Sequence, residues 1–338
     1  MIKEALSKIV SRNDLTMAEA REVMREIMKG EATQAQIGAF LTALRMKGET
    51  ADEIAGCALA MRESAIAVKP KSNQLVDTCG TGGDGKGTFN ISTTVAFVAA
   101  GAGLAVAKHG NRSVSSRCGS ADLLQALGVN LELTQEQVAQ CIDEVGIGFL
   151  FAPKLHPAMK YALGPRQEIG LRTIFNILGP LSNPAQAKRQ LLGVYNSDLT
   201  ELIAEVLRTL GAEHAFVVHG ADGLDELSVT GQNKISRLYD GYIETYYLDP
   251  QDLGLPRARL SDLAGGSVEE NAAITKALLA GKDGPKRDVI LLNAAAVLIA
   301  GGKASSFSEG LGLAAEAIDN GSAQRKLHQL IKFSRSFN

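Results

Sequence analysis

The sequence of 338 residues contains no tryptophan, nine prolines and only four cysteines, and aromatic residues make up 5% of it. The cysteines, Cys57, Cys79, Cys118 and Cys141, form no CxxC pair and no spacing typical of a zinc site. We therefore expect reduced thiols, as in a cytoplasmic protein, rather than a disulfide framework. The sequence also lacks an uncharged apolar run of about 18 residues, so we predict no membrane-spanning segment.

Neither sign of charge dominates the chain. It has 35 Lys and Arg against 37 Asp and Glu, a formal net charge of −2. This balance argues against a protein whose main partner is nucleic acid, because such proteins carry an excess of positive charge. The apolar fraction of 45% is ordinary for a globular protein, and the length is sufficient for two domains.

The chain divides into two parts by pattern. Residues 1 to about 69 are predicted to contain helices only, because Thr16, Thr33 and Thr50 each start a capping box followed by apolar residues at helical spacing. From residue 74 onward, short apolar strands alternate with helices, which indicates an α/β domain.

We therefore predict an α/β protein with a small all-helical N-terminal domain, residues 1–70, and a larger α/β domain, residues 71–338. The larger domain should have a mainly parallel central sheet surrounded by helices. Part of the proline-interrupted stretch 161–187 is expected to pack against the helical domain. Strands are expected at 74–78, 104–107, 215–219, 235–239 and, as a further candidate, 242–248. Helices in the larger domain are expected at 92–101, 120–127, 135–144, 198–210, 268–279, 288–300, 305–319 and 322–333.

The segment Asp77–Thr88 is rich in glycine, which occupies five of its twelve positions. It follows a short strand and precedes an Ala-rich helix. A loop of this kind can bring main-chain N–H groups close to an anion, and the positive end of the helix dipole favours negative charge there. The segment therefore predicts a phosphate site, and a plain surface turn would need fewer glycines.

Two better-known motifs fit the same segment poorly. Gly80–Gly85 matches the dinucleotide pattern G-x-G-x-x-G, but the next strand ends in Lys108-His109 without the acidic residue that binds ribose. Gly80–Gly87 nearly matches the P-loop, but Gly87 stands where a magnesium-binding hydroxyl is needed. We therefore favour a different phosphate ligand.

A second polar cluster, Lys108–Asp122, follows the strand expected at 104–107. It contains Lys108, Arg112 and Arg117 together with several hydroxyl groups. Cations and neutral donors at the carboxyl end of a strand suit a polyanion, although a solvated polar loop is the alternative interpretation.

A third cluster places Asp225 and Glu226 after the strand expected at 215–219. Adjacent carboxylates suit Mg²⁺ shared with substrate phosphates, whereas an ordinary acidic turn is the alternative. Elsewhere, Arg166 is a candidate carboxylate clamp or a member of an ion pair, and His156 is a ligand contact or a structural histidine. The residues alone leave both choices open.

Together these clusters resemble the anthranilate phosphoribosyltransferase family of tryptophan biosynthesis. The matching motifs lie in order between residues 77 and 226: G-T-G-G-D, N-I-S-T, K-H-G-N-R, S-S-x-x-G-S-A-D, R-T-I-F-N-I-L-G-P-L and G-L-D-E. The long run from Arg172 is the most specific, because no general phosphate site needs it. One departure is Gln167, where a second basic residue is expected.

The resemblance implies transfer of the 5-phosphoribosyl group from phosphoribosyl pyrophosphate to the amine of anthranilate, giving N-(5-phosphoribosyl)anthranilate and pyrophosphate. It implies Mg²⁺, two ions, held by Ser92, Asp225 and Glu226. It also implies a homodimer formed through the helical domain, with neither a nucleic acid nor a membrane as partner. No catalytic acid or base is assigned, since the weakly basic amine is neutral at pH 7.

The resemblance also assigns the substrate contacts. The expected donor-binding residues are Gly80, Gly83, Asp84, Thr88, Asn90, Ile91, Ser92, Thr93, Lys108, His109, Gly110, Asn111, Arg112, Ser113, Val114, Ser115, Ser116 and Ser120. The expected anthranilate-binding residues are Gly80, Asn111, Arg166, His109, His156 and Pro180.

Two other functions are alternatives. A nucleoside phosphorylase of the same general fold would need only a monophosphate site, which would leave Asp225-Glu226 and the long 108–120 segment without a role. A nucleic-acid-binding relative would need a basic face and eroded phosphate motifs.

Overall fold

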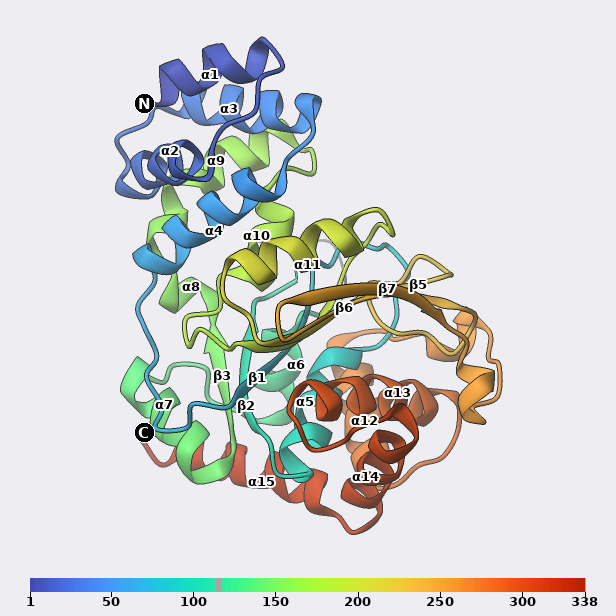
Figure 1. Ribbon diagram of the computed structural model, residues 1–338. Coiled ribbons are helices and arrows are strands. Elements are labelled where there is room, and N and C mark those ends of the chain that lie inside the picture. Colours follow the sequence, from blue (N-terminus) through green and yellow to red (C-terminus); the bar gives the residue numbers. More distant parts are fainter. Residues whose placement is uncertain (114–116, 338) are drawn as a thin grey trace.

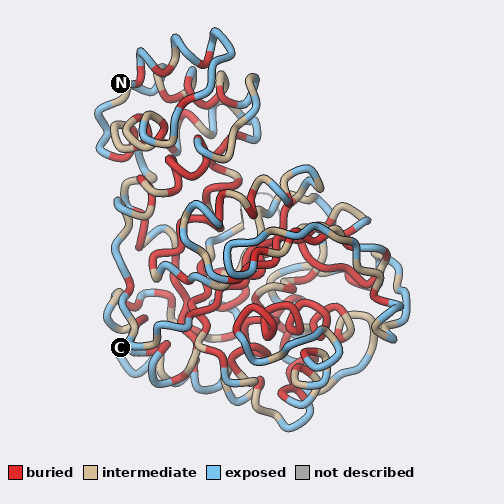
Figure 2. Tube along the Cα trace, viewed as in Figure 1, coloured by how far each residue is buried: buried red, intermediate tan, exposed pale blue. Residues whose placement is uncertain are grey.

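The computed structural model describes residues 1–113 and 117–337, and its two parts are visible in Figure 1. At one end lies a helical part, and the larger α/β part lies below it in that view. The helical part comprises α1 (Ile2–Val10), α2 (Met17–Lys29), α3 (Gln34–Lys47) and α4 (Ala51–Ser64), together with α9 (Lys160–Ile169) from much later in the sequence. Figure 2 shows buried segments in both parts.

The three predicted helix starts are confirmed. Thr16, Thr33 and Thr50 each accept a hydrogen bond from the amide three residues on, and the Glu or Gln at that position reaches back to the cap amide. Gly30 ends α2 with a φ of 75°, a left-handed conformation that favours glycine. Local sequence therefore determines where these helices begin.

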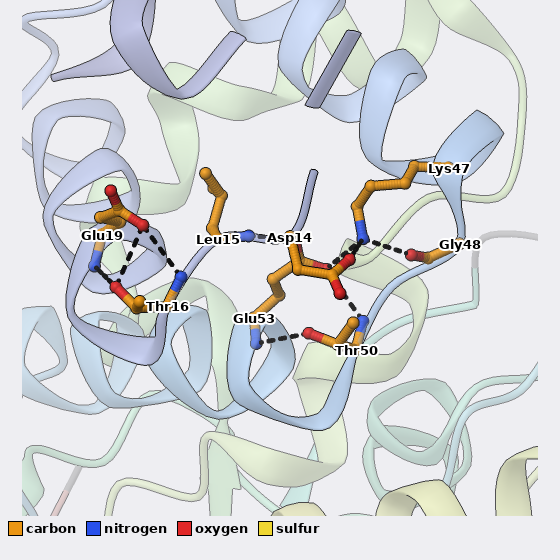
Figure 3. Close-up of polar contacts among 8 residues, drawn as sticks. All are labelled: Asp14, Leu15, Thr16, Glu19, Lys47, Gly48, Thr50 and Glu53. Carbon is orange, nitrogen blue, oxygen red and sulfur yellow. Dashed lines mark hydrogen bonds and ion pairs between the residues drawn. The ribbon is translucent and has the colours of Figure 1, made fainter. Parts of the chain in front are cut away.

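A buried carboxylate, that of Glu53, joins the connections between these helices (Figure 3). Its side chain is fully buried and accepts hydrogen bonds from Leu15 N at 2.9 Å and Thr50 N at 2.9 Å. Lys47 Nζ lies 3.0 Å from Glu53 Oε2 and also pairs with Asp14 at 2.6 Å. The charge is thus buried but fully paired, which is the condition for its toleration.

We expect Glu53→Ala to destabilise the protein by about 3–5 kcal/mol, because it leaves buried Lys47 short of a partner and two amides unsatisfied. Glu53→Gln, which keeps an acceptor oxygen, should cost less. Glu22→Ala, which removes a half-exposed partner of Arg25, should cost under about 1 kcal/mol. Urea unfolding measures all three, and equal losses for Glu53→Ala and Glu22→Ala would contradict this account.

A seven-stranded sheet with the order β3-β2-β1-β4-β5-β6-β7 forms the centre of the larger part. Pairs among the first five strands are parallel, and β6 and β7 are antiparallel, so the sheet is mainly parallel as predicted. The strands are β1 (Leu75–Gly80), β2 (Ala105–Gly110), β3 (Ile147–Phe151), β4 (Arg189–Gly193), β5 (His214–Gly220), β6 (Asn233–Tyr239) and β7 (Tyr242–Leu248).

Helices cover both faces of the sheet. The remaining α-helices are α5 (Ile91–Gly101), α6 (Ser120–Leu127), α7 (Gln135–Val145), α8 (Ala152–Leu155), α10 (Phe175–Leu181), α11 (Leu199–Thr209), α12 (Val268–Leu279), α13 (Pro285–Ala300), α14 (Phe307–Asp319) and α15 (Ser322–Arg335), with short 3₁₀ turns at Pro157–Met159, Pro250–Leu253 and Leu260–Leu263. In β5, Phe216 and Val218 face the core beneath α5 and α13, whereas Ala215 and Val217 face the core shared with α4 and α11.

The stretch 161–187 packs against the N-terminal helices. Ala162 and Leu178 belong to the same apolar cluster as Phe40 and Leu44, and α9 packs against α2 and α3. Arg62 of α4 donates from Nε to the carbonyl of Leu181 at 2.7 Å. These contacts support a helical unit completed by later residues, and the domain division near residue 70 stays a prediction.

The sequence patterns missed two strands and ended two others too early. β3 and β4 were not expected, since each is five residues long and neither alternates polar with apolar residues. Such strands are buried on both faces, so their period is hidden. β1 and β2 extend to Gly80 and Gly110, so Lys108 and His109 lie within a strand rather than in the loop after it.

None of the helices within residues 1–113 and 117–337 is both long and apolar enough to cross a membrane.

Candidate functional site

The carboxyl ends of four parallel strands meet at one edge of the sheet. These ends are Gly80 of β1, Gly110 of β2, Gly193 of β4 and Gly220 of β5. β2 and β3 lie on one side of β1 in the sheet, and β4 and β5 lie on its other side. The pair β1–β4 is therefore a topological switch point, where loops diverge and parallel α/β sheets bind ligands.

The loop after β1 has no regular structure from Thr81 to Gly87. Gly82, Gly83, Gly85 and Gly87 of this loop have φ between 66° and 76°, a region that residues other than glycine rarely adopt. The loop is anchored at its start by Thr81 N donating to Gly193 O at 2.9 Å. Thr81 N, Gly82 N and Lys86 N donate to protein oxygens, so among the described residues the amides of Gly83, Asp84, Gly85 and Gly87 are the candidates to bind an anion.

The acidic turn after β5 packs directly on these strand ends. Gly82 N donates to Asp225 Oδ2 at 2.6 Å. A Cβ atom at Gly80 would clash with the Asp225 carboxylate, and one at Gly193 would clash with the Asp225 carbonyl. Glycine at both strand ends therefore allows the carboxylate to reach the switch point.

Glu226 lies deeper, with 9% of its surface exposed. Its Oε1 accepts a hydrogen bond from Ser92 N at 3.2 Å, in the first turn of α5, where the helix dipole favours negative charge. Lys108 Nζ donates to Thr78 O and lies 3.4 Å from Ser92 Oγ. Sequence-distant residues of β1, α5, β2 and the acidic turn thus meet.

Negative charge exceeds positive charge in this cluster. Burial raises the pKa of Glu226 well above its usual value, and repulsion from Asp225 adds to the shift while Lys108 opposes it. Burial also raises the pKa of Asp225, and the nearby Asp84 adds to that shift. The cluster would therefore be stabilised by an additional cation.

The donor set fits magnesium bound together with a phosphate ligand. In the part of the chain that the structure describes, no group of three or more His, Cys, Asp or Glu side chains could hold a metal by itself. Magnesium usually keeps several waters and takes one or two protein carboxylates plus substrate phosphates. Asp225 and Glu226 supply the carboxylates, and the Ser92 hydroxyl lies beside the same cluster.

The segment after β2 is held by its own contacts. Ser120 Oγ, at the start of α6, donates to Asn111 O at 3.1 Å, and Arg112 pairs with Asp122 at 2.9 Å. Asn90 Nδ2 donates to Cys118 O at 3.0 Å and so links this segment to the start of α5. The predicted donor contacts Val114, Ser115 and Ser116 lie outside the described residues.

The other predicted donor residues differ in exposure. The Ile91 side chain packs in the core, and Thr93 is buried with an Oγ1 atom that has no hydrogen-bond partner among the described residues. Thr88 forms an isolated antiparallel bridge with Ala264. Asp84 Oδ1 accepts from Lys86 N at 3.1 Å and stabilises the bend of the loop.

Arg166 lies on α9, on the helical side of the site. Its guanidinium carbon is 4.9 Å from the centre of the Phe175 ring. Within residues 1–113 and 117–337 this guanidinium makes no hydrogen bond or ion pair, and burial lowers its pKa. An ordinary ion pair, one of the two sequence-based interpretations, is therefore absent there, and a half-buried cation without an anion suits a carboxylate ligand.

His109 and His156 lie near α10, with ring centres 5.2 Å apart. Both side chains are buried, and neither Nε2 atom has a hydrogen-bond partner in the described part of the chain. Burial lowers the pKa of His109 to about 3, with repulsion from His156 and Lys108 adding to the shift, and burial lowers the pKa of His156 to about 4. Both rings are thus neutral at pH 7 and contact the main chain of Gly179 and Ser182.

Asp77 was not among the predicted site residues. This fully buried carboxylate of β1 accepts from His109 N at 3.2 Å and from Asn183 Nδ2 at 2.8 Å. Asn183 also donates to Ala107 O at 2.9 Å, so the pair fixes β2 and the segment after α10 beside β1. An acidic residue within an apolar strand was the available signal, since a buried carboxylate requires partners.

The depressed histidine pKa values predict that stability falls in acid. Between pH 7 and pH 5 the unfolded chain takes up protons on these rings and the folded chain does not, so the free energy of unfolding decreases by about 2 kcal/mol per ring. We expect His156→Gln to reduce this decrease by about that amount in urea unfolding at the two pH values.

His328→Gln is the matched control, because that ring is exposed in the folded chain. A decrease between pH 7 and pH 5 that is as large in His156→Gln as in the unaltered protein would contradict the assignment.

The fold, a helical bundle joined to an α/β domain, is that of a class of glycosyltransferases. Two family models support this class. The model described as the helical bundle domain of the glycosyl transferase family matches residues 3–65, and the model of its a/b domain matches residues 72–324.

Individual relatives narrow the class. The chain is 59% identical over 337 residues to the anthranilate phosphoribosyltransferase of Moorella thermoacetica, covering 100% of this chain and 99% of that protein. The crystal structure of the Thermus thermophilus enzyme superposes with a TM-score of 0.94 at 47% identity, over 98% of this chain and 99% of that one. The enzyme of Saccharomyces cerevisiae, solved in complex with PRPP and Mg, gives 0.91 at 30% identity, over 99% and 98%. The chain therefore belongs to the anthranilate phosphoribosyltransferase family.

Proposed function

We propose that the protein transfers the 5-phosphoribosyl group from phosphoribosyl pyrophosphate to the amine of anthranilate, releasing pyrophosphate, in tryptophan biosynthesis. The observation that carries this proposal is the meeting of the glycine loop, Lys108 and the pair Asp225–Glu226 at the β1–β4 switch point. That combination suits a magnesium-bound diphosphate, and Arg166 supplies a cation for the acceptor carboxylate.

On the donor side, the protein binds a polyanion and stabilises charge that grows as the bond breaks. Loss of pyrophosphate from C1 builds negative charge on the leaving oxygens. The amides of Gly83 and Asp84, Lys108 and the segment Asn111–Ser120 would bind those oxygens. Asp225, Glu226 and Ser92 would hold magnesium, which when bound acts as a Lewis acid on the diphosphate.

The proposal includes two magnesium ions. Three carboxylates, those of Asp84, Asp225 and Glu226, repel one another in this cluster, which supports the binding of divalent cations there. The relative from Saccharomyces cerevisiae was solved with PRPP and Mg, which supports the metal.

On the acceptor side, Arg166 would bind the carboxylate and turn the amine toward C1. Neutral His109 and His156, each with an Nε2 that has no partner among the described residues, would contact the acceptor beside Pro180, and Gly80 and Asn111 would complete its site. A weakly basic aromatic amine is neutral at pH 7 and attacks without a strong base, so positioning carries this half of the reaction. Excluding water would protect the donor from hydrolysis.

Asp225→Asn combined with Glu226→Gln should reduce kcat by at least about 10²-fold, because it removes the charge that holds the metal. It should also raise the free energy of unfolding without metal by about 1–2 kcal/mol, because two repelling buried charges are gone. Activity and urea unfolding are measured with and without Mg²⁺, with exposed Asp283→Asn as control. A double variant with near-normal turnover refutes the metal assignment.

Arg166→Ala should raise KM for anthranilate about tenfold or more and change KM for the donor less than about twofold, since a charge-assisted pair with the carboxylate is lost. Arg166→Lys keeps the charge but not the bidentate geometry, so its KM for anthranilate should lie between those of the unaltered protein and of Arg166→Ala. Steady-state kinetics with each substrate varied decide the question. Equal effects on both KM values exclude the clamp role.

A direct assay separates this proposal from its rivals. The fluorescence of anthranilate should disappear only when phosphoribosyl pyrophosphate and Mg²⁺ are both present. A nucleoside phosphorylase would instead consume nucleoside and phosphate, and a nucleic-acid-binding protein would show neither reaction.

We also propose a homodimer formed through the helical part and a cytoplasmic location. Exposed apolar side chains on the helical part, among them Val10 at 73% and Met46 at 74% exposure, support the interface. The four cysteines are free thiols, which supports a reducing compartment. Light scattering of the protein and of Met46→Asp tests the dimer.

A further inference from the structure

Arg172 connects the acceptor side of the site to the glycine loop. It lies three residues beyond the end of α9, and it is exposed. Its guanidinium donates to the carbonyl of Gly83, and the guanidinium carbon lies 4.5 Å from the centre of the Tyr195 ring. A cation over an aromatic face is attracted to it, so Tyr195 helps to place the guanidinium against the loop.

Tyr195 is itself tied to the start of the same loop. Tyr195 N donates to Thr81 Oγ1 at 3.1 Å, and Thr81 N donates to Gly193 O at the end of β4. Arg172 therefore contacts a residue, Tyr195, that is hydrogen-bonded to the ends of both β1 and β4 through Thr81.

Two neighbouring residues of the glycine loop make hydrogen bonds of opposite kind: one donates to a carboxylate and the other accepts from a guanidinium. On one side Gly82 N donates to the Asp225 carboxylate, and on the other side Gly83 O accepts from Arg172. Within the described residues, no other hydrogen bond joins residues 157–187 to residues 81–87. Arg172 is thus the hydrogen-bonded link between the acceptor-side stretch and the donor loop.

The acceptor-side stretch is attached to the helical part. α9 packs against α2 and α3, and it carries Arg166. A shift of α9 on binding an acceptor would therefore be transmitted to Arg172 and from it to the Gly83 carbonyl. Because several loop glycines have left-handed φ and the loop has few anchors, one contact can alter its conformation.

We propose that Arg172 is a positioning residue that couples occupation of the acceptor site to the conformation of the donor-binding loop. This inference rests on the proposed function and adds a residue and a linkage to it. Linkage is reciprocal, so a diphosphate that orders the loop must strengthen acceptor binding by the same factor as the acceptor strengthens diphosphate binding.

The test measures that factor without turnover. The dissociation constant of anthranilate is obtained from its own fluorescence, with and without saturating magnesium pyrophosphate, which fills the diphosphate part of the site and cannot react. In the unaltered protein we expect magnesium pyrophosphate to tighten anthranilate binding at least about fivefold. In Arg172→Gln we expect a ratio below about two.

Matched variants separate coupling from general structural damage. Arg325→Gln is the control, because Arg325 is also exposed and also donates to a main-chain carbonyl, that of Asn320, far along the chain on α15. It should keep the full ratio. Tyr195→Phe keeps the ring and should keep the ratio, whereas Tyr195→Leu should reduce it. Arg172→Lys should be intermediate, since lysine lacks the planar fork.

Two results overturn the proposal: a ratio near one in the unaltered protein, or an unchanged ratio in Arg172→Gln. An unchanged ratio would also be found if Arg172→Gln weakened pyrophosphate binding equally with and without anthranilate. In that case Arg172 would be a direct phosphate contact and not a coupling residue. The proposed function is judged separately, because it fails only if the unaltered protein does not consume anthranilate with phosphoribosyl pyrophosphate and Mg²⁺.

Discussion

The close approach of the Asp225–Glu226 turn to the β1–β4 strand ends is the contact on which the site depends. It requires Gly80 and Gly193, because a side chain at either position would overlap Asp225. Burial raises the pKa values of both carboxyls, and repulsion from neighbouring carboxylates adds to the shift. For Glu226, Lys108 and the Ser92 amide in the first turn of α5 only partly offset this shift. The folded protein therefore carries an electrostatic cost that a bound cation would relieve, and such perturbed groups are common at functional sites.

Around that contact, one edge of the sheet assembles the proposed donor site and the helical part supplies the proposed acceptor site. Arg166 reaches the site from α9, which packs among the N-terminal helices although it follows them by about a hundred residues in the chain. In this proposal the donor binds at the edge of the sheet and the acceptor binds on the side of the helical part. This division gives the Arg172 contact its importance, since it crosses from one part to the other.

Much of the fold was predictable from local signals. Capping boxes located the starts of α2, α3 and α4, and alternation of strands with helices indicated the mainly parallel sheet. β3 and β4 were not predictable in this way, because strands buried on both faces show no polar–apolar period. The ends of β1 and β2 were placed too early, since glycine and charged residues normally mark loops.

By itself the sequence determined the chemistry that the chain can offer: glycines able to adopt left-handed φ, a pair of adjacent carboxylates, and cations in motifs typical of one family. Only the tertiary structure decided which of these groups meet. It gave Asp77 its buried partners, placed the Arg166 guanidinium over Phe175, and brought the His109 ring against that of His156. These facts depend on contacts between residues far apart in the chain, and such contacts arise from packing that no local pattern encodes.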